Sequence, residues 1–211
     1  VVRACCSRLD IPLNTTEGPI VEDWGGCRIQ FGAEQNSPVY YAQRTGPVTA
    51  RILQVAHPEQ PQHFGEEVIF SARPLNDAPS AGEEEGHLYL YPHIEVLRGN
   101  DVIAFDLDGV HPGESELVRL TDLLVSFGGT LQVRSNEQYK VFFNEDELDG
   151  FYAYACISKE VDLRAVYLAL EKLCAPWTHP LVFVRLARCV GDPAWIKEQE
   201  ERMEKYCLTV D

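Results

Sequence analysis

The sequence has 211 residues and a strongly acidic charge balance, with 33 Asp and Glu against 18 Lys and Arg and a formal net charge of -15. An acidic surface argues against binding nucleic acid or an anionic membrane, because both depend on Lys and Arg meeting phosphate groups. No apolar run reaches the length of a membrane span. We therefore expect a soluble protein, whose length suits one large domain or two units of about 100 residues each, and we favour two units.

The cysteines and the first residues bear on the compartment. The seven cysteines form no CxxC pair and no spacing typical of a zinc site. An odd number of thiols, several of them in apolar contexts, indicates reduced and buried cysteines in a reducing environment. The opening Val-Val-Arg-Ala-Cys resembles what remains after an organelle import peptide is removed. We expect an intracellular protein of the cytoplasm or of an organelle matrix or stroma.

Residues 1–98 are predicted to form a β-rich unit. Short stretches of β-branched and aromatic residues are separated by Gly and Pro, and no helical period of useful length is present. The predicted strands are 27–31, 39–44, 49–56, 67–72 and 87–97. The segment 76–86 contains Pro, Ser, Gly and a run of three Glu, and is expected to be a solvated loop or hinge.

Residues 99–211 are predicted to form a second unit in which strands alternate with helices. The predicted strands are 101–107, 130–134, 139–143, 150–157 and 181–189, and the predicted helices are 114–127, 161–174 and 193–206. Asp192 and Pro193 are typical of the N-cap and first position of the last helix. This alternation favours an α/β domain with a mostly parallel sheet. The alternative is an α+β ferredoxin-like βαββαβ domain, which needs two of these helices and similar strands.

The string Val-Ile-Ala-Phe-Asp-Leu-Asp-Gly-Val at 102–110 places two aspartates two positions apart after strand-like apolar residues. It resembles the first motif, DxDG[TV], of the haloacid dehalogenase superfamily. Similar elements follow in the family's order: Pro112-Gly113, a helix, Gly128-Gly129, a strand to Ser135-Asn136, Ser158-Lys159 before a helix, and Gly191-Asp192. The resemblance covers roughly the C-terminal half of the chain. It departs from the family where no second acidic residue closely follows Asp192.

This resemblance implies a Rossmann-like α/β domain that works as a Mg²⁺-dependent phosphohydrolase on a small phosphorylated substrate. Asp106 would attack phosphorus to form an aspartyl-phosphate, and Asp108 would protonate the leaving oxygen and later activate water. The implied metal ligands are Asp106, the backbone carbonyl of Asp108, and Asp192. Ser135 and Lys159 would bind the phosphoryl oxygens.

A simpler interpretation of the same string stays open. Asp106 and Asp108 can be the outward residues of an alternating strand, with Phe105 and Leu107 facing the core and Gly109 turning the chain. The last predicted helix has only a thin apolar stripe, so it either packs lightly on its own domain or docks on another protein. With the acidic surface, this favours a non-catalytic subunit or assembly factor that has a protein partner.

Overall fold

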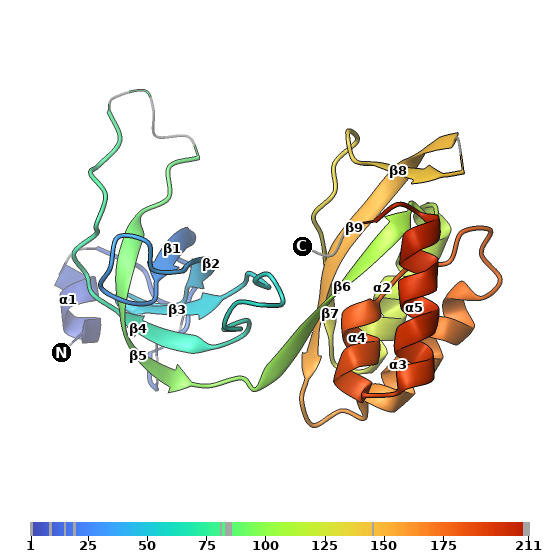
Figure 1. Ribbon diagram of the computed structural model, residues 1–211. Coiled ribbons are helices and arrows are strands. Elements are labelled where there is room, and N and C mark those ends of the chain that lie inside the picture. Colours follow the sequence, from blue (N-terminus) through green and yellow to red (C-terminus); the bar gives the residue numbers. More distant parts are fainter. Residues whose placement is uncertain are drawn as a thin grey trace. The chain divides into compact units, whose positions relative to one another are not determined.

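A computed structural model of the chain describes residues 2–8, 10–14, 16–18, 20–80, 82, 86–144 and 146–208 (Figure 1). Residue 1 at the expected cleavage point, and residues 81 and 83–85 of the expected hinge, lie outside this part. The chain divides into two units, one of Val1–Gln54 with His63–Asn100 and one of Val55–Gln62 with Asp101–Asp211. The sequence predicts a boundary between residues 98 and 99 and places 55–62 in the first unit.

The first unit contains a closed five-stranded barrel. Its strands are β1 (Gly26–Gln30), β2 (Val39–Arg44), β3 (Thr49–Ile52), β4 (Glu67–Phe70) and β5 (Leu90–Arg98). Successive strands are antiparallel and β1 closes the barrel on β5 in parallel, since an odd number of alternating strands returns to the starting direction. Alternate residues such as Tyr40 and Ala42 are buried inside. The β-rich prediction is confirmed, whereas the short helix α1 (Val2–Arg8) is not predicted by any periodicity.

The sheet of the second unit is antiparallel, so the predicted mostly parallel, Rossmann-like sheet is wrong. Strands β6 (Val102–Val110), β9 (Asp146–Ser158) and β7 (Thr130–Val133) lie in the order β6-β9-β7, and β8 (Lys140–Phe143) forms a hairpin with β9. The helix between β6 and β7 leaves these two strands running in the same direction, but β9 returns between them. Val182 forms an antiparallel bridge with Asp108 on the other edge of β6.

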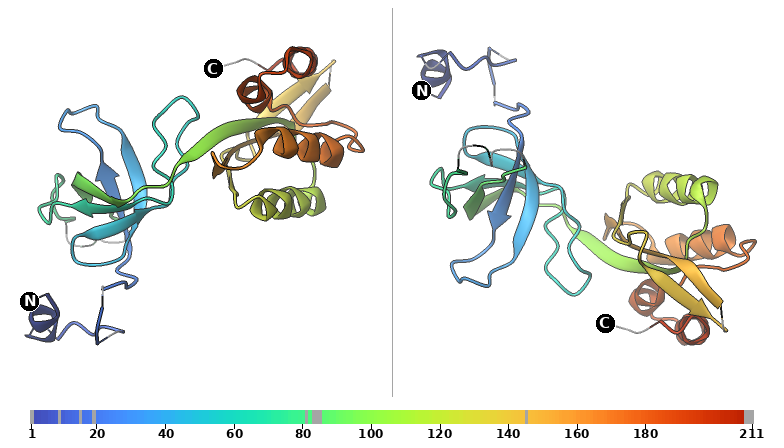
Figure 2. Two further views of the ribbon diagram at one scale, coloured as in Figure 1. Left: turned by 90° about the horizontal axis from the view of Figure 1, so that it is seen from below. Right: turned by 90° about the horizontal axis from the view of Figure 1, so that it is seen from above.

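Two helices cover one face of this sheet. The apolar stripes of α2 (Glu114–Ser126) and α3 (Leu163–Cys174) bury Leu120, Leu124 and Leu170 against it. The views in Figure 2 show both helices on the same side of β6. Two helices on one face, and an antiparallel order of Val182, β6, β9 and β7, correspond to the ferredoxin-like βαββαβ topology that the sequence left as the alternative.

The predicted strand 181–189 is wrong beyond its first residues. The chain forms helix α4 (Val184–Val190), because Phe183, Leu186 and Ala187 are buried at a helical spacing that a short apolar run does not distinguish from a strand. Helix α5 (Pro193–Lys205) follows, with the Asp192 side chain accepting a hydrogen bond from the Ala194 amide as the predicted N-cap.

The last helix packs on its own unit. Gln199, at the centre of its thin stripe, is fully buried, and Tyr206 just after the helix is buried as well. Among the described residues, no helix is long and apolar enough to cross a membrane. All seven cysteines lie in the described part and are free thiols. Burial raises the pKa of Cys156 and of Cys174 to about 12, as expected for unreactive core thiols.

Candidate functional site

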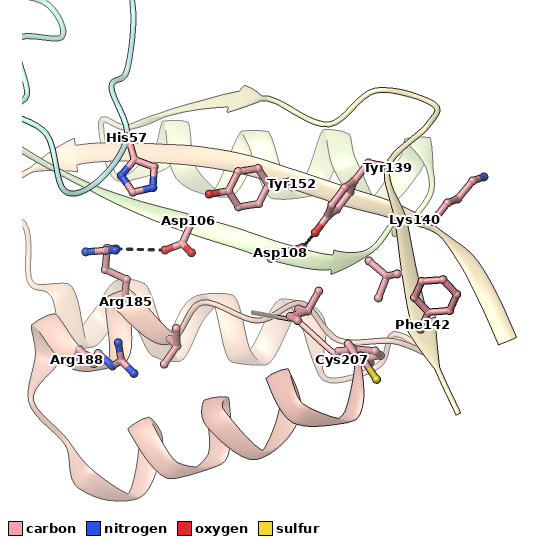
Figure 3. Close-up of a pocket in the computed structure, with 14 residues that line it drawn as sticks. His57, Asp106, Asp108, Tyr139, Lys140, Phe142, Tyr152, Arg185, Arg188 and Cys207 are labelled. Atoms are coloured by element: carbon pink, nitrogen blue, oxygen red, sulfur yellow. Dashed lines mark hydrogen bonds and ion pairs between the residues drawn. The ribbon is translucent and has the colours of Figure 1, made fainter. Parts of the chain in front are cut away.

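Strand β6 sends alternate side chains to opposite faces of the sheet, and this alternation positions the candidate site. Phe105 and Leu107 are fully buried under the helices. Asp106 and Asp108 therefore face the other side, where they line a cavity of about 380 Å³ within the second unit (Figure 3). The other residues that line it are His57, Tyr139, Lys140, Val141, Phe142, Tyr152, Val184, Arg185, Arg188, Tyr206, Cys207 and Leu208.

Asp108 is held by several hydrogen bonds. Its Oδ1 accepts from the Gly109 amide at 2.7 Å and from the Tyr139 hydroxyl at 2.7 Å. Its backbone N–H and carbonyl are both used by Val182, at 2.9 and 2.7 Å. Gly109 has a φ of +144°, and a Cβ there would lie 3.2 Å from the side chain of Leu181. The positive φ therefore favours glycine after the second aspartate, and the neighbouring segment leaves little room for a Cβ.

Asp106 forms an ion pair with an arginine of helix α4. Its Oδ1 lies 3.5 Å from Nε of Arg185, and the two atoms form an ion pair. Both atoms are buried, and neither has a hydrogen-bond partner among the described residues. Arg185 also contacts Glu59, with Nη2 3.2 Å from Oε1. Buried polar atoms of this kind are rare in folded proteins because an unmade hydrogen bond costs about 1–3 kcal/mol.

The arginines come from one helix. Arg185 and Arg188 are three positions apart on α4, so both side chains project from the same face. Arg188 pairs with Glu200 of α5 at 2.8 Å, and Lys140 pairs with Asp149. Each cation of the cavity wall therefore has an acidic partner, and most of these partners are exposed.

Tyrosines of β9 stand beside the aspartates. Tyr152 and Tyr154 lie opposite Asp108 and Asp106 in the β6–β9 register. Burial raises the pKa of Tyr152, and its hydrogen bond to Tyr154 and the charges of the two aspartates raise it further. Tyr152 is therefore a neutral hydroxyl at neutral pH.

The segment Val55–Gln62 supplies His57 to the cavity. The Val55 amide donates to Oε1 of Gln132 at 3.0 Å, and Arg134 donates to the Val55 carbonyl at 2.6 Å. The His57 ring meets Tyr154 edge to face, with ring centroids 5.7 Å apart. Contacts with β7 and the residue after it, and with β9, thus hold this segment on the face of the sheet that carries Asp106 and Asp108.

The structure brings Asp106 and Asp108 into one cavity but does not gather the other predicted site residues there. Ser135 pairs with Tyr152 through its backbone and accepts the Tyr152 amide on its hydroxyl at 3.1 Å, beside the cavity rather than in its wall. Lys159 lies past the far end of β9 and pairs with Asp101 at 2.6 Å. Asp101 precedes Asp106 by five positions, which is about 17 Å along an extended strand, so Lys159 lies far from Asp106.

The carboxylates expected to hold Mg²⁺ do not fit a shared metal site. Asp192 is the N-cap of α5, and its Oδ2 lies 2.8 Å from Nη2 of Arg164. The Asp108 carbonyl is used in the bridge to Val182, and Asp106 faces a guanidinium. Within the ranges that the structure covers, no group of three or more His, Cys, Asp or Glu is placed to hold a metal ion.

The sequence interpretation missed the basic wall of the cavity. Arg185 and Arg188 lie in a run that was predicted as a strand, where a spacing of three would send them to opposite faces. Tyr152 carried a usable signal, since the string Tyr-Ala-Tyr-Ala at 152–155 alternates large polar-tipped and small residues. His57 carried none, because its place depends on a segment that folds onto a strand far away in the sequence.

Comparison of the chain with protein-family models, curated proteins and solved structures finds no match. The resemblance to the haloacid dehalogenase superfamily therefore rests on the sequence elements around Asp106, Ser135, Lys159 and Asp192 alone.

Proposed function

We propose that the second unit binds a small molecule carrying an anionic group, a phosphate or carboxylate, together with a hydrogen-bond donor. The observation that carries the proposal is that the ion pair of Asp106 and Arg185, with Oδ1 3.5 Å from Nε, lines the cavity and leaves the two side chains 27% and 26% exposed. A ligand that offers an acceptor to the accessible nitrogens of the guanidinium and a donor to the accessible carboxylate oxygen would pair with both groups.

The charge balance of the cavity supports a ligand with groups of both kinds. Asp106 and Asp108 form one wall, and Arg185 and Arg188 form another. Arg185 and Arg188 pair with Glu59 and Glu200, whose side chains are exposed, and such pairs contribute only about 0–1 kcal/mol. The anionic group of a ligand can therefore displace these two carboxylates at little cost.

The remainder of the wall is apolar and indicates a ligand with some apolar surface. Val141, Val184 and Tyr206 line the cavity and are buried together in a small cluster, and Leu208 packs against them. A few polar groups that converge beside apolar side chains are typical of small-molecule sites. This mixture does not resemble a flat protein–protein surface.

Titration of the whole chain with O-phospho-L-serine, followed by calorimetry, tests the proposal. This probe carries a phosphate for the arginines and an ammonium group for the aspartates. We expect millimolar or tighter binding that Arg185→Gln weakens about tenfold or more, since a charge-assisted pair contributes about 1.5–3 kcal/mol. Arg119→Gln, an exposed position on α2 outside the cavity, is the matched control and should bind like the wild type. Absence of binding to the wild-type chain would refute the proposal.

Phosphohydrolase activity is a second candidate, and the placement of Asp106 and Asp108 in one cavity supports it. Hydrolysis of a generic aryl phosphate, with and without Mg²⁺, is the direct assay, with Asp106→Asn as the comparison. Turnover that is lost in this variant would favour the enzyme. No turnover by a folded wild-type chain would favour a non-catalytic binding unit.

A further inference from the structure

Glu59 contacts the arginine that the ligand is proposed to use. Its Oε1 lies 3.2 Å from Nη2 of Arg185, while the Nε of the same guanidinium faces Asp106. The Glu59 side chain is 59% exposed and that of Arg185 is 26% exposed. On its solvent side, Arg185 is therefore already paired with a carboxylate of the protein itself.

The turn that carries Glu59 is formed by its own hydrogen bonds. Nε2 of Gln62 donates to the carbonyls of Ala56, His57 and Gln60, at 3.3, 2.9 and 3.1 Å. Oε1 of Gln62 accepts from the Ala56 amide at 3.1 Å. The Glu59 amide donates to Nδ1 of His57 at 3.3 Å, and the His57 ring lines the cavity. The backbone of Glu59 is thus fixed next to His57, which lines the cavity, and its exposed side chain reaches Arg185.

We infer that the Glu59 carboxylate occupies the position on Arg185 that the anionic group of the ligand takes, and that the ligand displaces it. This inference rests on the proposed ligand-binding function. The contact is made by the Glu59 side chain and an exposed ion pair is weak, so the exchange costs little. Asp106 stays in place beneath the guanidinium, because its Oδ1 is buried and Glu59 is the more exposed of the two partners.

The displacement of Glu59 favours a phosphate over a carboxylate as the anionic group of the ligand. Replacing one carboxylate by another at the same guanidinium gains little, because the contact is equivalent. A phosphate monoester carries a charge of about -1.5 to -2 and three acceptor oxygens, so it gains from displacing a single carboxylate. We therefore expect O-phospho-L-serine to bind more tightly than L-glutamate, which carries a carboxylate in place of the phosphate.

The test compares Glu59→Gln with Glu201→Gln in the same calorimetric titration. Both changes remove one negative charge, but Glu201 pairs with Lys197 on α5 and does not line the cavity. Glu59→Gln should raise the affinity for O-phospho-L-serine about two- to fivefold, the range of an exposed ion pair. Glu201→Gln should leave it unchanged. Unchanged or weaker binding by Glu59→Gln would overturn the inference.

The titrations of the wild type and the variants distinguish a failure of this inference from a failure of the proposed function. If the wild type binds and Arg185→Gln weakens binding, but Glu59→Gln matches the wild type, then Glu59 does not occupy that position on Arg185 and the binding function stands. If the wild type fails to bind O-phospho-L-serine, the binding function fails and the inference fails with it. If Glu201→Gln gains as much as Glu59→Gln, the gain comes from net charge, and the specific contact is refuted.

Discussion

The buried amide of Gln199 is expected to stabilise the α3–α5 region, and its replacement by leucine tests this. Gln199 is fully buried, and its Oε1 accepts the Phe183 amide at 2.8 Å. Its Nε2 donates to the Tyr167 hydroxyl at 3.2 Å and to Glu171 at 2.5 Å. Phe183 directly precedes α4, so this contact also supports the helix that carries Arg185.

The magnitude follows from the groups left without partners. Leucine has a similar volume but cannot accept the Phe183 amide, and a buried unsatisfied N–H costs about 1–3 kcal/mol. Loss of the bonds to Tyr167 and Glu171 adds about 1 kcal/mol. We expect Gln199→Leu to lower the opening free energy of this region by about 2–4 kcal/mol, which corresponds to roughly 30- to 700-fold faster exchange.

Hydrogen exchange followed by mass spectrometry measures the effect in the right place. Peptides from α3, α4 and α5 should exchange faster in Gln199→Leu, and peptides from β1–β5 in the same sample are the internal reference. Gln138→Leu, at an exposed position of the second unit, is the control and should change stability by no more than about 0.5 kcal/mol. Exchange in α3–α5 within a factor of about three of the wild type would refute the role assigned to the buried amide.

Two further predictions concern the cores of the two units. Leu124→Ala removes a fully buried side chain beneath the sheet and should cost about 2–5 kcal/mol in urea unfolding, whereas Val125→Ala, 58% exposed on the same helix, should cost no more than about 0.5 kcal/mol. Similar costs for both would contradict the assigned helix face. In the barrel, burial and repulsion from His63 lower the pKa of His93, with Glu66 opposing them. Because His93 binds its proton less readily when folded, stability should be full above its ordinary pKa of about 6.5 and fall as the pH drops below it. Thermal unfolding between about pH 8 and pH 5 should show this fall in the wild type and a smaller one in His93→Gln, and equal falls would count against it.

The sequence by itself determined the local features of the second unit. The alternation in β6 places Asp106 and Asp108 on one face and Phe105 and Leu107 on the other, whatever the fold around them. The stripes of α2 and α3 and the Asp192 cap of α5 were also predicted, because helical periodicity and capping depend on residues only a few positions apart.

The tertiary structure alone decided which distant residues meet. The return of β9 between β6 and β7, which makes the sheet antiparallel, depends on which strands bury the most apolar surface together. The same holds for the segment 181–189, whose apolar run suits a strand or a helix until its neighbours select one. Arg185 and Glu59 are brought together by that selection and by the docking of 55–62. Long-range contacts of this kind leave no periodic pattern in the chain, so the acidic wall of the cavity was visible in the sequence and its basic wall was not.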